Sequence, residues 1–69
     1  MASLKEYRLQ AGFSVAELAR RAGVDQGPIK RAESGHPVQE VKAAAIAQAL
    51  SQALNQKLSI QELGIALYS

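Results

Sequence analysis

The stretch SVAELARRAGVDQGPIKRAESG, residues 14–35, decides the fold of this chain of 69 residues. Ser14 and Glu17 stand three residues apart, a capping-box pattern in which each side chain binds a backbone N–H at the start of a helix. Gly23 is expected to end that helix, because glycine is common just after a last helical turn. Asp25 is then a candidate N-cap for a second helix.

Two short helices joined by a three-residue turn predict a helix-turn-helix unit over about residues 15–34. The second helix opens on the unusual pair Gly27-Pro28. If Asp25 is the N-cap, Pro28 is the third helical residue, a position where its missing N–H costs no hydrogen bond within the helix. Glycine then suits the position before proline, which is pushed out of the α region. In the competing register Gly27 is the cap, Pro28 takes the first helical position, and the helix is about one turn shorter.

Apolar residues recur with helical spacing along the rest of the chain, and no run alternates like a strand. One expected helix places Leu4, Tyr7 and Ala11 on one face and ends at Gly12. A long helix and a last short helix follow, predicted by an apolar stripe and by a second capping box. The stripe is Ala43, Ile46, Ala47, Leu50 and Leu54, and the box is Ser59 and Glu62. We expect a single all-α domain, residues 1–69, of five compact helices.

Composition excludes several classes of function. The chain has no cysteine and one histidine, His36, so it has no disulfide framework and no thiolate metal site. No carboxylate pair has a spacing suited to catalysis, and we expect no enzyme activity, no cofactor and no small-molecule ligand. No apolar run approaches the ~20 residues of a membrane span, so we expect a cytoplasmic protein. The formal net charge of +2 is too small to indicate nucleic acid by itself.

Residues 14–35 resemble the helix-turn-helix of the Cro and lambda-repressor-like (XRE-type) family of phage and bacterial regulators. The matching positions are Arg8, Gly12-Phe13-Ser14, Glu17-Leu18-Ala19, Ala22-Gly23-Val24, Ile29, Glu33, Gly35 and Ile46-Ala47-Gln48-Ala49-Leu50. The resemblance runs from about Leu4 to Leu63. It implies a lambda-repressor-like domain that binds double-stranded DNA as a transcriptional regulator, with repression as the expected role. It also implies a structural ion pair between Arg8 and Glu33.

In this architecture the recognition helix, about residues 26–34, lies in the major groove with its N-terminal residues on the base edges. Glutamine can pair with adenine, and arginine or lysine with guanine. The expected base contacts are Gln26, Gly27, Lys30 and Arg31. The expected phosphate contacts are Ser14, Val15, Arg20, Pro28, Ser34 and His36. The alternative for Lys30 and Arg31 is a plain solvated face, and Gly27-Pro28 makes the reading surface thinner than usual.

Regulators of this kind commonly bind two-fold symmetric operators as dimers, with half-sites ~34–36 Å apart. The apolar tail, residues 64–68, is a candidate homodimer contact; the alternative is that Ile65 and Leu67 fold back onto the core. An alternative function is a protein-interaction module or antitoxin-like partner with weak or no sequence-specific DNA binding. The two functions differ in salt dependence, which is steep for phosphate contacts.

Overall fold

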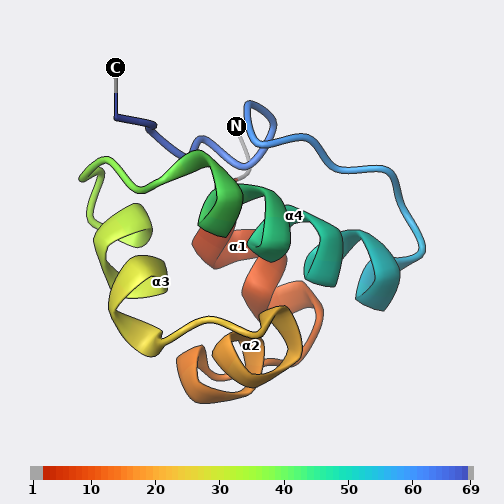
Figure 1. Ribbon diagram of the computed structural model, residues 1–69. Helices are drawn as coiled ribbons and strands as arrows, with labels where there is room; N and C mark the ends of the chain where they lie inside the picture. Colours follow the sequence, from red (N-terminus) through yellow and green to blue (C-terminus); the bar gives the residue numbers. More distant parts are fainter. Residues whose placement is uncertain (1–2, 69) are drawn as a thin grey trace.

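The computed structural model describes residues 3–68 and contains the four helices labelled in Figure 1. They are α1 (Leu4–Gln10), α2 (Val15–Ala22), α3 (Gln26–Glu33) and α4 (Glu40–Leu54). The all-α prediction is confirmed, since the β-structure among residues 3–68 is limited to one isolated bridge between Val38 and Leu67. None of the four described helices is long and apolar enough to cross a membrane.

A tight turn joins α2 to α3. Ser14 caps α2 by accepting a hydrogen bond from the Glu17 N–H at 3.0 Å. Gly23 follows the helix with φ 73°, a left-handed conformation that glycine adopts without a Cβ penalty. The Val24 N–H then donates to the Ala19 carbonyl at 3.0 Å, which satisfies a backbone acceptor in the last turn of the helix. The chain thereby reverses within a few residues, in the helix-turn-helix arrangement.

The first turn of α3 accommodates Gly27-Pro28 without a break. Asp25 is the N-cap residue, with extended backbone angles of φ −71° and ψ 165°, and α3 begins at Gln26. Pro28 is thus the third helical residue, where its missing N–H removes no intrahelical hydrogen bond. The Asp25 side chain makes no capping hydrogen bond. The helix therefore follows the longer of the two predicted registers, although the expected side-chain cap is not formed.

The core lies where α4 packs across the other helices (Figure 1). Leu18 of α2, Ile29 of α3 and Leu50 of α4 are 0% exposed. Burying each such side chain contributes about 1.5–3 kcal/mol. The stripe predicted on α4 is buried except for Leu54, which is partly buried against the core. The helical spacing of apolar residues therefore predicted the inner face of α4 correctly.

The five-helix count is not confirmed, because residues 60–64 form a single turn. The predicted capping box is present: the Glu62 N–H donates to Ser59 Oγ and the Ser59 N–H donates to Glu62 Oε1, both at 3.0 Å. Gly64 then takes φ 70°, in the left-handed region that ends a helical turn. The local start signal is real, but the helix stops after one turn.

The C-terminal segment, residues 65–68, folds back beside the loop between α3 and α4 (Figure 1). The Val38 N–H donates to the Ala66 carbonyl at 2.9 Å, and the Tyr68 N–H donates to the Val38 carbonyl at 3.3 Å. Ile65 is buried in the core, whereas Leu67 is 37% exposed. Ile65 therefore packs within its own chain. This agrees with the alternative to the dimer contact, in which Ile65 folds back onto the core.

Arg8 is a buried charged residue, 8% exposed, that joins α1 to the end of α3. Its Nε donates to Glu33 Oε2 at 2.6 Å and its Nη2 donates to Glu33 Oε1 at 3.2 Å. The remaining nitrogen, Nη1, donates to the Phe13 carbonyl at 2.9 Å. The structure therefore contains the ion pair that the resemblance implies, and the same guanidinium also holds the loop between α1 and α2.

Candidate nucleic-acid interface

α3 has one buried face and one exposed face. Ile29 and Ala32 are buried, while Gln26, Lys30 and Arg31 are exposed. Gln26 is the first residue of the helix, at the end that approaches base edges when a helix-turn-helix docks in the major groove. Hydrogen-bonding side chains therefore stand on the outer face of a helix whose inner face is anchored in the core.

Gly27 and Pro28 reduce the number of hydrogen-bonding side chains on this outer face. Gly27 is exposed but has no side chain, and Pro28 is half-buried. A side chain at position 27 would have space, because no atom beyond its own helix and its chain neighbours lies within 4 Å of the place of its Cβ. The surface beside Gln26 is therefore open space. Of the four predicted base contacts, three carry a side chain that can form hydrogen bonds.

Four of the predicted phosphate contacts lie at the ends of the helix-turn-helix unit. Ser14 is exposed at the N-cap of α2, and Val15 is the half-buried first residue of that helix. Ser34 is the exposed C-cap of α3, and His36 is exposed in the following loop. Ser14 and Val15 lie at a position suited to binding an anion, because the first N–H groups of a helix have no acceptor within the helix.

Arg20, another predicted phosphate contact, is engaged by Glu17 on the same helix. The Arg20 guanidinium donates to both carboxylate oxygens of Glu17, and Arg21 Nε donates to Oε2 at 2.7 Å. Glu17 therefore does not complete the capping box predicted with Ser14, because two arginines one turn further along compete for its carboxylate. The Arg20 side chain is nevertheless 70% exposed.

These hydrogen bonds predict a pH dependence. The hydrogen bond from Arg20, and then that from Arg21, lowers the pKa of Glu17 from its ordinary value of 4.5. A carboxyl with a lowered folded pKa stabilises the fold above pH 4.5, and this contribution is lost as the pH falls through the lower folded value. We expect Glu17→Gln to flatten the acid side of a stability–pH curve by a small amount, because the pair is on the surface.

Denaturant unfolding at several pH values, with NMR titration of the Glu17 carboxyl carbon, measures this effect. Glu6→Gln removes the same charge from an exposed position on α1 and serves as the control. A Glu17 pKa at or above 4.5 would contradict the prediction.

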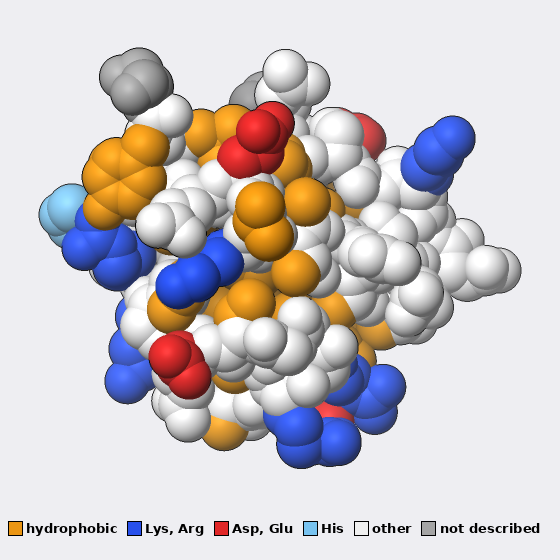
Figure 2. All heavy atoms as spheres, viewed as in Figure 1, with side chains coloured by type: hydrophobic (Ala, Val, Ile, Leu, Met, Phe, Trp, Pro, Cys, Tyr) orange, Lys and Arg blue, Asp and Glu red, His pale blue; other side chains and the backbone are white. Residues whose placement is uncertain are grey.

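Basic side chains gather at two edges of the face that carries α3 and α4. Figure 2 shows Lys and Arg at the left over α3 and along the bottom over α2, with hydrophobic side chains across the middle over α4. The bases on α2 and α3 are Arg20, Arg21, Lys30 and Arg31. The excess positive charge of the first half of the sequence therefore lies on the two helices of the helix-turn-helix unit.

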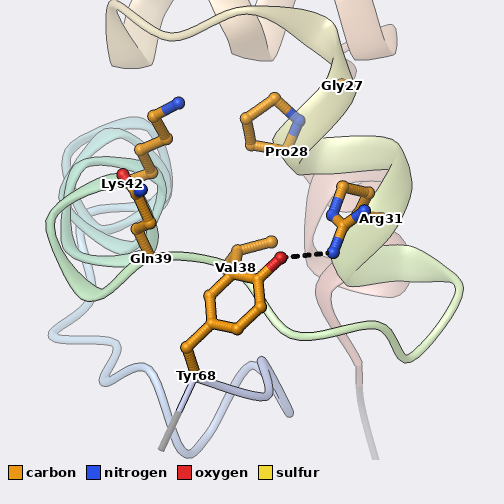
Figure 3. Close-up of a pocket in the computed structure, with 7 residues that line it drawn as sticks. All are labelled: Gly27, Pro28, Arg31, Val38, Gln39, Lys42 and Tyr68. Atoms are coloured by element: carbon orange, nitrogen blue, oxygen red, sulfur yellow. Dashed lines mark hydrogen bonds between the residues drawn. The ribbon is translucent and has the colours of Figure 1, made fainter.

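A cavity of about 250 Å³ lies between α3, the start of α4 and the C-terminal segment. It is lined by Gly27, Pro28, Arg31, Val38, Gln39, Lys42 and Tyr68 (Figure 3). The Tyr68 hydroxyl points to Arg31 and accepts a hydrogen bond from its Nη2 at 2.6 Å. Nothing in the sequence pattern predicts that Gln39, Lys42 or Tyr68 lies beside α3, since only the folded chain brings them there.

The described part of the chain offers no clustered metal ligands. Among residues 3–68, no group of three or more His, Asp or Glu side chains could hold a metal ion. The exposed face of α3 instead carries hydrogen-bonding groups: the amide of Gln26 and the positively charged groups of Lys30 and Arg31.

A comparison with protein families agrees with this geometry. A family profile described as a helix-turn-helix domain matches residues 2–58, which include α1 to α4 but not the C-terminal segment. No curated protein and no solved structure matches the chain. Since the profile covers most of the sequence, the chain belongs to the helix-turn-helix domain family, consistent with an XRE-type regulator.

Proposed function

We propose that this protein binds double-stranded DNA sequence-specifically as a transcriptional regulator, with α3 as the recognition helix in the major groove. The observation that carries the proposal is the division of α3 into a buried face, Ile29 and Ala32, and an exposed face that begins with Gln26 at the first helical position. Membership of the helix-turn-helix family supports the same function. The expected role is repression of transcription. We expect the protein to act in the cytoplasm and to have no enzyme activity.

Each base-reading side chain has an expected partner. Gln26 can bind the N6 and N7 atoms of adenine with its amide, and Arg31 can bind O6 and N7 of guanine. Lys30, on the same exposed face, suits either guanine or a phosphate. Phosphate contacts from the start of α2 and the loop after α3 would position the helix without reading sequence. Because Gly27 contributes no side chain, we expect a short recognised sequence in each half-site.

Selection from a random pool of duplex DNA, followed by titration of the enriched sequence at several salt concentrations, tests the proposal. We expect a palindromic sequence with half-sites ~34–36 Å apart, which requires a homodimer on DNA. Affinity should fall steeply with salt, because each phosphate contact releases counterions. No enrichment, with equal weak binding to all sequences, would contradict sequence-specific recognition.

Gln26→Ala should remove ~1–3 kcal/mol of discrimination at one adenine of the selected sequence. Affinity for unrelated DNA should change little, because base contacts do not contribute to it. Binding of the selected duplex and of its single-base variants measures the effect. The control is Gln48→Ala, which truncates an exposed glutamine on α4. Loss of affinity that is equal on every sequence would contradict a base contact by Gln26.

A protein-interaction module is the second candidate, favoured by one observation on α4. Val41 is 81% exposed. It lines a hollow close to the turn between α2 and α3, where the apolar side chains of Ala22, Val24 and Ala45 lie beside Asp25 and Lys42. An apolar surface of this kind suits a protein partner, whose affinity would vary little with salt. A dimer or heterologous complex weakened by Val41→Asp, with weak DNA binding, would favour this second function.

A further inference from the structure

Arg31, the expected reader of guanine, is held by two oxygen atoms of its own chain. Its Nη2 donates to the Tyr68 hydroxyl at 2.6 Å and to the Pro37 carbonyl at 3.1 Å. The centre of the guanidinium lies 5.9 Å from the centroid of the Tyr68 ring. We name these three residues the Arg31 clasp; Tyr68 stands outside the part of the chain that the family profile matches.

The clasp engages the nitrogen that guanine would need. A guanidinium has two edges along which two N–H groups point in the same direction. One edge is formed by Nε and Nη2, and the other by Nη1 and Nη2. Bidentate binding uses one of these two edges, so it always uses Nη2. Arg8 illustrates the first edge, since its Nε and Nη2 bind the two oxygens of Glu33. Nη2 carries two hydrogens, and with two acceptors both are occupied in Arg31. Neither edge can therefore bind guanine O6 and N7 together while the clasp is closed.

We propose that Tyr68 is a specificity-determining residue, which competes with guanine for the Arg31 guanidinium. This inference rests on the proposed function and assigns a role to the C-terminal segment in it. With the clasp closed, α3 can bind DNA through phosphates and through Gln26 but reads guanine poorly. Recognition of guanine requires one of the two acceptors to release an Nη2 hydrogen. We assign this step to the exposed Tyr68 hydroxyl, and the free energy of its release is subtracted from guanine-specific binding.

The clasp can be opened without disturbing the fold. Tyr68 is 58% exposed, so its hydroxyl is not part of the core. The backbone of the segment is held separately, by hydrogen bonds of Val38 with Ala66 and Tyr68. Tyr68→Phe therefore removes one acceptor of Nη2 while the ring and the chain keep their places (Figure 3).

The experiment measures the dissociation constant of the full chain for the selected duplex and for the same duplex with the guanine opposite Arg31 replaced by adenine. We expect Tyr68→Phe to increase the ratio of the two constants by about three- to tenfold, the range of an ordinary hydrogen bond, because the Arg31–Tyr68 contact is exposed to water. Affinity for unrelated duplex DNA should change by less than about twofold, because phosphate contacts do not need either bidentate edge.

Four further measurements separate the possible failures. In an Arg31→Ala background, Tyr68→Phe should leave the ratio unchanged, and Tyr7→Phe, at the other tyrosine of the chain, should leave it unchanged in the wild type. Without DNA, NMR of the Arg31 side-chain nitrogens should show slower guanidinium rotation in the wild type than in Tyr68→Phe. A melting curve of Tyr68→Phe checks that the variant is folded.

A ratio that stays constant or falls in Tyr68→Phe overturns the inference and leaves the proposed function intact, provided that Arg31→Ala lowers the ratio. Equal guanidinium rotation in the wild type and in Tyr68→Phe also overturns the inference alone. A wild type without any preference among duplexes overturns the proposed function, and the inference with it.

Discussion

Arg8→Ala is expected to lower the free energy of unfolding by about 3–5 kcal/mol, because it leaves the largely buried Glu33 carboxylate without its charged partner. The side chains of Arg8 and Glu33 are only 10% and 13% exposed, so water cannot replace the lost interaction fully. The substitution also removes the donor to the Phe13 carbonyl. At roughly 0.05–0.15 kcal/mol per residue, a domain of this size has a total stability of about 3–10 kcal/mol. Much of the variant should therefore be unfolded at 37 °C.

Thermal and urea unfolding followed by circular dichroism measures this loss. Lys5→Ala, at an exposed cation of the same helix, is the control and should leave the unfolding curve nearly unchanged. Arg8→Met combined with Glu33→Met should recover part of the stability, since apolar side chains can replace both partners of a buried pair. An Arg8→Ala curve that coincides with the wild type would contradict a structural role for the pair.

Ile29→Ala should destabilise the protein by about 2–5 kcal/mol, the usual range for truncating a buried isoleucine. Ile29 is 0% exposed and anchors α3 in the core. The loss combines the removed apolar surface with the cavity that remains. DNA affinity should fall in proportion to the unfolded fraction, since the variant changes no exposed group of α3.

Ile29→Val is the matched control, with an expected loss of about 0.5–1.5 kcal/mol. Urea unfolding gives both values. An unchanged slope of the unfolding free energy against urea concentration would show that the two-state transition is preserved. A loss in Ile29→Ala no larger than that in Ile29→Val would mean that α3 is not held by this side chain.

The helices could be predicted from the sequence because their signals are local. Ser14 before α2 and Gly23 after it act on the neighbouring backbone, and the structure has the helix between them. The second capping box, at Ser59, formed the predicted hydrogen bonds but not a helix. A capping box starts a turn, and whether the turn continues depends on the residues that follow, here Gly64 in a left-handed conformation.

The partners of the charged side chains were harder to predict. Glu17 had three local candidates, the Ser14 N–H, Arg20 and Arg21, and the two positive charges prevailed over the neutral donor. The contact between Arg31 and Tyr68 joins residues 37 positions apart. No periodicity or spacing marks such a contact, because it depends on the path that the chain takes after α4.

Alanines share the core with the larger side chains of this protein: Ala19 on α2, Ala32 on α3 and Ala43, Ala47 and Ala49 on α4 are all buried. An alanine has no rotamers to lose, so its burial carries no side-chain entropy cost. For the same reason it cannot change rotamer to accommodate a shift of its neighbour. Each of α2 and α3 thus buries one side chain with no alternative rotamer, Ala19 and Ala32, beside one larger side chain. We therefore expect substitutions at the exposed positions of α3 to leave the packing of these helices unchanged.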